Sequence, residues 1–242
     1  MVARDRAAYH EPVIGTALDF EHVQRELLER GYAHIPRLLD ADACLALRAT
    51  FDEPQHFRSH IVMEKHNFGR GEYKYFRYPL PEPVARLREH FYRGLVPVAN
   101  HWNELLGKRE RFPEGEQQFL EFCNEHGQVR PTALLLRYRS GDYNCLHEDT
   151  YGEVAFPFQM TVFLSAREEY EGGEFVLVEQ RPRMQSRPIV LQPQRGDALI
   201  IPNRYRPVQG KNGYYRTIFR HGVSEIRAGE RYALGVIFHD AQ

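Results

Sequence analysis

From residue 131 to its end, the chain is divided into short apolar or alternating stretches separated by Gly, Pro and Asp. Each stretch has the length of a β-strand, and turn residues at such regular intervals are typical of sandwiches and jelly rolls. The stretches read TALLLRY, VAFPFQMTVFLS, GEFVLVE, PIVLQ, DALIIP, YYRTIFRHGV and RYALGVIFH. The pattern therefore predicts a mainly β protein with some α, built on at least seven short strands.

The first half of the chain has a helical pattern instead. Residues 20–30 place apolar side chains on one helical face and end at Gly31, and Asp40 is placed to cap a second helix that continues to residue 51. Residues 60–81 have no clear period, and a lid over a substrate is one role open to them. Further helices are expected over residues 83–92, 96–106 and 114–125.

The simplest architecture is one domain over residues 1–242. A helical N-terminal half, residues 1–130, would support a jelly-roll catalytic core at residues 131–242, in the form of a double-stranded β-helix. We find no internal repeat and no low-complexity tract that would argue for a second domain.

Composition excludes several classes of protein. The net charge of −1 favours no particular partner, and three cysteines without a CxxC spacing argue against a disulfide framework or a zinc knuckle. The N-terminal sequence MVARDRAAYHEP lacks the apolar core of a secretory signal, and no apolar run approaches a membrane span. We expect a cytoplasmic protein with no membrane partner.

Four polar residues indicate a specific chemistry. His147 and Asp149 stand one residue apart, and His221 and Arg231 follow on later predicted strands. Two imidazoles and one carboxylate can occupy one face of an Fe(II) ion and leave the other positions open. An arginine can hold the far carboxylate of a dicarboxylic keto acid through two hydrogen bonds.

Other interpretations of these residues stay open at this point. A His-x-Asp triplet arises easily by chance among twelve histidines. Its position after TALLLRY and a turn favours a site at the start of a strand, where residues i and i+2 point the same way. His239 competes with His221 as the third ligand, although we favour a surface or packing role for it. Arg231 could be an ordinary surface arginine.

These residues also carry a family resemblance. The order and spacing of GDYNCLHED, EGGEF, RGDALIIP and HGVSEIRAGERYAL resemble the 2-oxoglutarate/Fe(II)-dependent oxygenase superfamily, in its prolyl-hydroxylase-like branch. The full chain, including FRSHIVMEKHNFGRGEYKYFRYPLP and EQRPRMQSRP, is similar to a narrower bacterial family assigned to oxidative demethylation of damaged DNA bases.

The resemblance implies a role for each candidate residue. It makes His147, Asp149 and His221 the iron ligands and pairs Arg231 with the C5 carboxylate of 2-oxoglutarate. Tyr138 lies near the position of a cosubstrate-binding tyrosine, although a core role would explain it equally well. Thr161 could donate a hydroxyl to the same carboxylate, but a β-branched residue in a strand needs no such reason.

The resemblance also implies a reaction. Fe(II) and 2-oxoglutarate would hydroxylate a C–H bond with O2 and release succinate and CO2. Hydroxylation of an N-methyl group leads to its loss as formaldehyde, whereas hydroxylation of a ring or aliphatic carbon leaves a stable alcohol. The iron ligands do not distinguish these outcomes, because the substrate pocket decides them.

Two segments suggest nucleic acid as a partner. Residues 181–220 contain nine Lys and Arg against one acidic residue, and an aromatic and basic run over residues 68–78 could stack on a flipped base. Charged loops and aromatic strands are also ordinary features of a solvated β protein. The basic cluster includes Arg181, Arg183, Arg187, Arg204, Arg206, Lys211 and Arg216.

The segment after His221 bears on the substrate. It reads HGVSEIRAGER, the arrangement of protein and small-molecule hydroxylases, and lacks the Arg-x-Asn-x-Thr-x-Arg pattern of the DNA and RNA demethylases. Three hypotheses therefore remain: an oxygenase of nucleic-acid bases, a hydroxylase of a protein side chain or small metabolite, and a non-catalytic jelly-roll protein that binds a metal or ligand.

Overall fold

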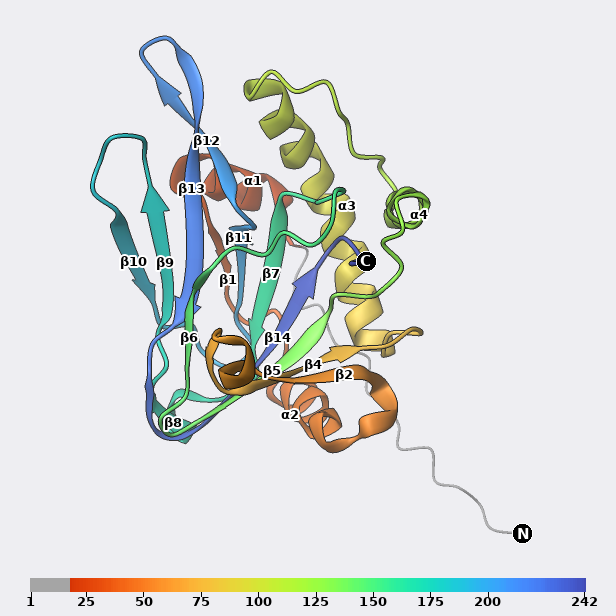
Figure 1. The fold of residues 1–242 in the computed structure, drawn as a ribbon, viewed down its shortest axis with the longest axis vertical. Helices are drawn as coiled ribbons and strands as arrows, with labels where there is room; N and C mark the ends of the chain where they lie inside the picture. Colours follow the sequence, from red (N-terminus) through yellow and green to blue (C-terminus); the bar gives the residue numbers. More distant parts are fainter. Residues whose placement is uncertain (1–17) are drawn as a thin grey trace.

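Two antiparallel β-sheets lie face to face at the centre of the structure (Figure 1). The computed structural model describes residues 18–242. The N-terminal sequence in which we expect no secretory signal lies outside the described residues. The larger sheet has eight strands in the order β1-β11-β7-β14-β5-β4-β2, with β8 paired to β14. Its strands are β1 (Ala33–Ile35), β2 (Phe57–Val62), β4 (Glu72–Phe76), β5 (Leu134–Arg139), β7 (Phe158–Phe163), β8 (Tyr170–Gly172), β11 (Ala198–Pro202) and β14 (Ile226–Ile237).

The smaller sheet has six strands in the order β10-β9-β13-β6-β3, with β12 paired to β13. Its strands are β3 (Gly69–Arg70), β6 (Tyr143–His147), β9 (Phe175–Gln180), β10 (Arg187–Leu191), β12 (Tyr205–Gly210) and β13 (Gly213–Val223). Each of the seven stretches predicted as strands in the C-terminal half forms one, which confirms the mainly β character of the protein.

Helices cover the outer face of the larger sheet (Figure 1). The side chains of β7 show how, because they alternate between two environments. Phe158, Met160 and Val162 join the hydrophobic core that the helices share, whereas Gln159 and Thr161 face the smaller sheet. The inner face is thereby left for a cavity. The helices are α1 (Phe20–Arg30), α2 (Ala41–Ala49), α3 (Glu82–Leu105) and α4 (Glu116–Glu125).

The helix predictions are largely confirmed, with one correction. Asp40 caps α2 by accepting a hydrogen bond from the backbone N–H of Ala43, and Gly31 ends α1 in a left-handed conformation. The two helices expected over residues 83–92 and 96–106 are one helix, α3, which continues through Pro97. Burial of Val96 and Val98 on both sides of the proline offsets the hydrogen bond that Pro97 cannot donate.

The N-terminal half is less helical than we expected, because strands β1 to β4 lie within residues 1–130. These strands extend the two sheets: β4 pairs with β5, β1 with β11 and β3 with β6. Residues 60–81, which have no helical period, supply β3, β4 and the end of β2. Pairing with strands far along the chain, which local sequence does not reveal, decides their structure.

Candidate metal and cosubstrate site

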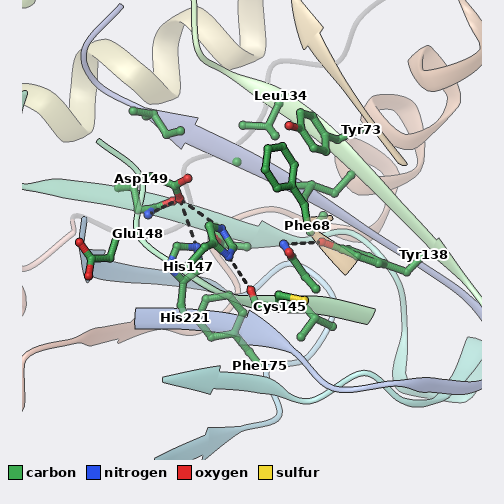
Figure 2. A pocket seen from close by; sticks show the side chains of 18 of the residues that line it. Phe68, Tyr73, Leu134, Tyr138, Cys145, His147, Glu148, Asp149, Phe175 and His221 are labelled. Carbon is green, nitrogen blue, oxygen red and sulfur yellow. Dashed lines mark hydrogen bonds and ion pairs between the residues drawn. The ribbon is translucent and has the colours of Figure 1, made fainter. Parts of the chain in front are cut away.

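A cavity of about 350 Å³ lies between the two sheets and is lined by residues of both (Figure 2). All six residues singled out from the sequence line it. These are His147, Asp149, His221, Arg231, Tyr138 and Thr161. The fold therefore brings together residues that are up to 93 positions apart in the chain, from Tyr138 to Arg231.

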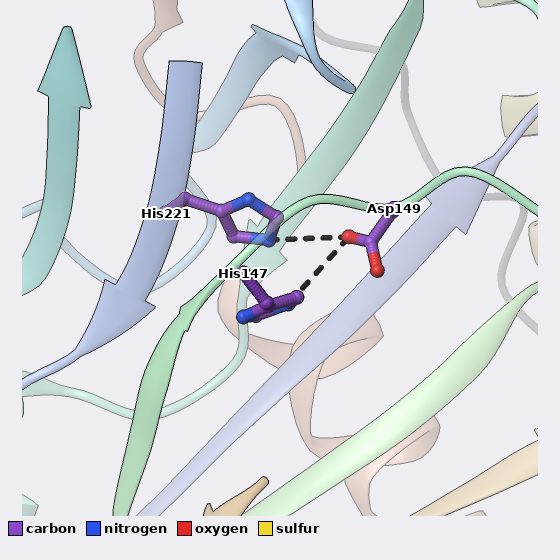
Figure 3. Close-up of side chains that lie close together, drawn as sticks. All are labelled: His147, Asp149 and His221. Atoms are coloured by element: carbon purple, nitrogen blue, oxygen red, sulfur yellow. Dashed lines mark ion pairs between the residues drawn. The ribbon is translucent and has the colours of Figure 1, made fainter. Parts of the chain in front are cut away.

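Three of them form a compact group of possible metal ligands. One ligand atom from each of His147, Asp149 and His221 lies within 4.8 Å of the others. The Asp149 Oδ2 atom is 3.2 Å from His221 Nε2 and 3.7 Å from His147 Nε2 (Figure 3). Two imidazole nitrogens and one carboxylate oxygen in such proximity are the donor set of non-haem iron sites, and this group could hold iron.

Strand pairing places the two histidines. His147 lies directly opposite His221 where β6 pairs with β13, so both imidazoles extend from the same face of the smaller sheet. The position of Asp149 differs from our expectation that His147 and Asp149 lie together at the start of a strand. His147 is the last residue of β6, and Asp149 lies in the loop beyond it, where its backbone N–H donates to the carbonyl of Asn203. That bond ties the loop to the larger sheet's β11 end.

A hydrogen bond to the backbone orients the His147 imidazole. Its Nδ1 lies 2.8 Å from the carbonyl oxygen of Cys145, so the proton belongs on Nδ1 and the lone pair of Nε2 is free. Burial lowers the pKa of His147, and the neighbouring His221 lowers it further. His147 therefore stays neutral at physiological pH, as a metal ligand must.

His221 is held by packing. Its ring lies against that of Phe175 on β9, with centroids 5.8 Å apart and an angle of 21° between the planes. It is buried, and its imidazole centroid is 4.1 Å from that of His147. Packing against the Phe175 ring therefore fixes the orientation of the His221 imidazole.

Asp149 is buried, and both of its carboxylate oxygens accept hydrogen bonds. The hydroxyl of Tyr151 donates to Oδ1 at 2.8 Å and the side-chain amide of Gln159 donates to Oδ2 at 2.7 Å. Burial by itself raises the pKa of this carboxyl, but His221, His147 and the Tyr151 hydroxyl together bring it below its ordinary value. The group therefore remains an ionised ligand.

His239, the competing third ligand, is not part of the group. It is fully buried, with Nδ1 accepting from the backbone N–H of Phe156, and burial lowers its pKa to about 4. The geometry thus favours His221 over His239. Of the two roles we considered for His239, packing is correct and surface exposure is wrong.

Arg231 is buried in the same cavity rather than exposed, with 1% of its surface accessible. It lies opposite Tyr138 where β14 pairs with β5, in the sheet that faces the histidines. The rings of Tyr138 and Phe163 flank its guanidinium at 5.5 and 5.2 Å. Within residues 18–242, its Nε and Nη2 atoms have no hydrogen-bond partner, which is costly for a buried cation.

Tyr138 and Thr161 line the same cavity from the two strands that flank β14. The Tyr138 hydroxyl accepts a hydrogen bond from the Asn144 amide at 3.2 Å, and burial raises the pKa of Tyr138 to about 12. Its own O–H proton is therefore retained and free to be donated. Thr161 is buried opposite Gly235 on β14, and the side chain of Leu134 packs against the face of that glycine.

The structure adds residues that the sequence analysis did not single out. Gln159 and Tyr151 hold Asp149, and Tyr73 and Tyr75 line the cavity from β4. One signal was available for Gln159, because a lone amide in the apolar stretch VAFPFQMTVFLS needs a buried partner. Nothing comparable marks the tyrosines, which are ordinary strand residues until their pairing is known.

Part of the basic segment is paired with two carboxylates. Glu179 forms ion pairs with Arg181, Arg187 and Arg206, and of these Arg206 is buried and also donates to the carbonyls of Leu28 and Glu29. Glu148, at the edge of the cavity, pairs with Arg204 and Arg220. Five of the nine basic residues therefore have a carboxylate partner, and Arg206 stabilises the fold.

The arrangement defines a class of protein. Solved structures of prolyl hydroxylases and of a 2OG-Fe(II) oxygenase family protein share this fold over 89% to 93% of the chain. A prolyl-4-hydroxylase of Pseudomonas putida has a TM-score of 0.52 at 14% identity, covering 92% of this chain and 99% of its own. A 2OG-Fe(II) oxygenase family oxidoreductase of Burkholderia pseudomallei has 0.51 at 16%, covering 93% of each chain.

A third structure is a prolyl hydroxylase of Trichoplax adhaerens, in complex with a hypoxia inducible factor oxygen degradation domain peptide fragment. Its TM-score is 0.54 at 14% identity, over 89% of this chain and 86% of that one. At identities this low, the structural likeness establishes a shared fold and leaves the substrate open.

The chain belongs to the Oxygenase-NA family, described as "Oxygenase, catalysing oxidative methylation of damaged DNA", which it matches over residues 71–241. Two uncharacterized proteins of Mycobacterium tuberculosis, from strains CDC 1551 / Oshkosh and ATCC 25618 / H37Rv, are 46% identical over 167 residues, which is 69% of this chain and 72% of theirs. The protein is thus an oxygenase by family, and it has the fold of the 2-oxoglutarate/Fe(II)-dependent oxygenases. Across residues 18–242, none of the helices is long and apolar enough to cross a bilayer.

Proposed function

We propose that the protein hydroxylates a C–H bond of its substrate, with iron held by His147, Asp149 and His221 and 2-oxoglutarate held by Arg231. The observation that carries this proposal is the Arg231 guanidinium, which is buried in the same cavity as the three ligands and has two nitrogens without a partner. A buried cation of this kind requires an anion, and the far carboxylate of 2-oxoglutarate offers two oxygens to its fork.

Two neighbours would complete the cosubstrate site. The Tyr138 O–H and the Thr161 hydroxyl are both in the cavity, on strands that adjoin β14. Each can donate one hydrogen bond to the carboxylate that Arg231 neutralises. The flanking rings of Tyr138 and Phe163 exclude water from that pair and so strengthen it.

The residues of the chain would orient and protect the reaction. When bound, iron and 2-oxoglutarate supply the oxidising chemistry, in which O2 is consumed, succinate and CO2 are released and one oxygen atom is added at a C–H bond. Asp149 stays ionised and His147 keeps Nε2 unprotonated, so neither ligand needs to lose a proton first. Apolar side chains exclude bulk water from the cavity, among them Leu134, Leu136 and Ile237.

We also propose that residues 1–242 act as one catalytic domain. The N-terminal half supplies β4, which pairs with β5, and Tyr73 and Tyr75 of β4 line the cavity. Support region and catalytic core would therefore fold and work as a unit.

A methylated nucleic-acid base is the substrate we favour. The family description connects its members with damaged DNA, and oxidation of an N-methyl carbon removes the methyl group as formaldehyde. Aromatic side chains that line the cavity, among them Tyr73 and Tyr75, suit a flat base. A hydroxylase of a protein side chain or small metabolite is the alternative, favoured by the sequence HGVSEIRAGER and by the pairing of five basic residues of the segment with carboxylates.

The decisive experiment offers substrates of both kinds to the iron-loaded protein with 2-oxoglutarate. Single-stranded and duplex oligonucleotides with methylated bases should release formaldehyde above the rate without substrate, and Asp149→Ala should abolish that release. Oxidation of peptides or metabolites alone, seen as the gain of one oxygen atom, would overturn the nucleobase assignment. Iron binding without any 2-oxoglutarate binding would overturn the oxygenase mechanism and favour a non-catalytic binding protein.

A further inference from the structure

Residues 63–71 form a strap that crosses from one sheet to the other at the cavity. Strand β2 before them and strand β4 after them belong to the larger sheet, whereas β3 between them pairs with β6 of the smaller sheet. The short helix η3 (Met63–His66) begins the strap, and Asn67 and Phe68 at its turn line the cavity (Figure 2). The strap therefore places side chains over the site from a third direction.

The backbone of the strap is held rigidly. The N–H of Phe68 donates to Met63, and the carbonyl of Phe68 accepts from the N–H of Cys145 on β6 at 2.9 Å. Gly69 has a φ of 121°, and a Cβ there would lie 2.4 Å from the carbonyl oxygen of Tyr143. Because only glycine fits so close to β6, Phe68 keeps a fixed place beside the strand that carries His147.

The side chain of Phe68 is far less covered than its backbone. It lines the cavity with 48% of its surface exposed, and Figure 2 shows it beside Tyr73 within the pocket. His66 stacks on one face of the ring, with centroids 5.5 Å apart and an angle of 22° between the planes. The apolar surface that stays open to solvent on this hydrogen-bonded turn is unfavourable unless a partner covers it. The position points to a contact made with the substrate.

Two tyrosines of β4 continue the aromatic surface toward the metal ligands. Tyr73 and Tyr75 are two residues apart and both lie on the cavity face of the strand, with ring centroids 5.3 Å apart and an angle of 87° between their planes. The Tyr75 hydroxyl is 3.4 Å from that of Tyr151, which donates to Asp149. Flat faces and polar hydroxyls therefore extend from the strap to the site where iron would bind.

We infer that the substrate presents a flat, unsaturated heterocyclic ring, which stacks on Phe68 and meets the hydroxyls of Tyr73 and Tyr75 with its polar edge. This inference rests on the proposed function, which supplies the reaction at the ring or at a methyl group on it. Stacking on an aromatic face tolerates any base, because every base has a flat π-face. The hydroxyls beside Phe68 suit the nitrogens and carbonyls at the edge of a base, which a prolyl or aliphatic side chain lacks. Free nucleosides and bases within a single strand share this chemistry.

The test compares Phe68 variants in the iron-loaded protein with 2-oxoglutarate in the absence of O2, so that the probe is not converted. The probe is 1-methyladenosine and the readout is equilibrium dialysis. Phe68→Leu keeps an apolar side chain without a flat face, and its affinity for the probe should fall about tenfold. Phe68→Trp should retain the affinity. The control is Phe122→Leu, because Phe122 on α4 is 46% exposed and lies outside the cavity.

The outcomes separate this inference from the proposed function. Equal affinity in Phe68→Leu and the parent protein would overturn the inference, as would tighter binding of a proline-containing peptide than of 1-methyladenosine. A parallel loss of 2-oxoglutarate affinity in Phe68→Leu would also overturn it, because Phe68 would then maintain the whole cavity. Failure of the parent protein to convert 2-oxoglutarate would instead count against the proposed function, and dialysis would still decide the role of Phe68.

A single-stranded oligonucleotide with one 1-methyladenine identifies the source of the ring. If it binds more tightly than the nucleoside and its affinity falls steeply with salt, the ring belongs to a nucleic acid. Equal affinities without salt dependence support a free nucleoside. Either result supports stacking on Phe68 if Phe68→Leu weakens the binding of both the oligonucleotide and the nucleoside.

Discussion

His147 and His221 lie directly opposite each other in the pairing of β6 with β13, and their imidazole centroids are 4.1 Å apart. The 73 residues between them contain most of the strands of the C-terminal half, so the pair exists only once β6 and β13, which are distant in the chain, have paired. Asp149 approaches the pair from the loop after β6 and supplies the one negative charge of the group. Correct assembly of the sheets and iron binding are therefore coupled.

Removal of any one of these three ligands should abolish iron binding and turnover. We expect His147→Ala, Asp149→Ala and His221→Ala to lose at least most of their bound iron, since two remaining donors do not hold Fe(II) firmly. Iron content after dialysis and conversion of 2-oxoglutarate to succinate measure the effect. His101→Ala is the matched control, because His101 is an exposed histidine on α3.

His239→Asn provides the opposing case. The asparagine keeps an acceptor for the Phe156 N–H, and His239 is outside the ligand group, so iron binding should be unchanged. If His239→Asn loses iron while His221→Ala retains it, our assignment of the third ligand is wrong.

Arg231 should govern the affinity for 2-oxoglutarate rather than for iron. We expect Arg231→Ala to raise the KM for 2-oxoglutarate about tenfold to a hundredfold, because a buried charge-assisted pair is lost. Arg231→Lys keeps the charge but cannot form two parallel hydrogen bonds, so its KM for 2-oxoglutarate should lie between those of Arg231→Ala and the unsubstituted protein. Steady-state kinetics at saturating iron provide the measurement.

Smaller effects are expected at the two proposed neighbours of Arg231. Tyr138→Phe and Thr161→Val each remove one neutral hydrogen bond, so the KM for 2-oxoglutarate should rise about fivefold or less. A KM in Arg231→Ala equal to that of the unsubstituted protein would mean that the anion binds elsewhere.

Gln159 should tune the metal site through Asp149. Its amide donates to the carboxylate oxygen that faces both histidines, and outer hydrogen bonds of this kind typically change metal affinity about tenfold or more. Gln159→Leu should therefore weaken iron binding about tenfold without loss of the fold. Competition with a chelator measures the affinity, and Gln117→Leu on the exposed face of α4 is the control. An unchanged iron affinity in Gln159→Leu would show that Tyr151 alone positions the carboxylate.

The sequence predicts the site better than it predicts what surrounds the site. His147, Asp149, His221 and Arg231 are recognisable because their order and spacing resemble a known family. The residue pattern alone left His239 open as a ligand. Tyr73 is not, since its orientation depends on the pairing of β4 with β5, which no local pattern encodes.

Arg206 shows the same limit in the opposite direction. In the sequence it belongs to a basic cluster that suggests phosphate contacts. In the structure it is buried against Glu179 and holds the last turn of α1. A charge in a sequence has no known partner until the fold supplies one, and burial then decides whether it binds a ligand or stabilises the protein.

The buried His239 should make the stability of the protein depend on pH. Burial lowers its pKa to about 4 in the folded state, against an ordinary 6.5 when unfolded. The unfolded state thus binds a proton more readily, so the contribution is fully present above about 6.5 and is lost as the pH falls toward 4. The whole effect is roughly 3 kcal/mol at 1.36 kcal/mol per unit.

Urea denaturation of the metal-free protein between these pH values measures that loss. The His239→Asn variant cannot take up the proton and should show a smaller loss of unfolding free energy over the same interval. Parallel pH profiles for the variant and the unsubstituted protein would show that His239 is not the responsible group.

Nucleic-acid binding, if it occurs, should depend on the basic residues that the fold leaves unpaired. Arg183 lies in the turn between β9 and β10, and Lys211 and Arg216 lie in the β12–β13 hairpin; both hairpins extend from the same end of the sheets (Figure 1). Within residues 18–242, none of these three forms an ion pair with a carboxylate. They are therefore available to phosphates, unlike Arg206.

Replacing Arg183, Lys211 and Arg216 with Gln should weaken the binding of a single-stranded oligonucleotide and reduce the dependence of log Kd on log salt by about two, at ~0.7 for each phosphate contact. Titration at several salt concentrations gives the slope. The control replaces Arg86 and Arg93, which lie on the exposed side of α3 and pair with Glu82 and Glu89, and should leave the slope unchanged. If the triple variant keeps the full slope, phosphates do not contact these hairpins, and a protein or small-molecule substrate becomes the better hypothesis.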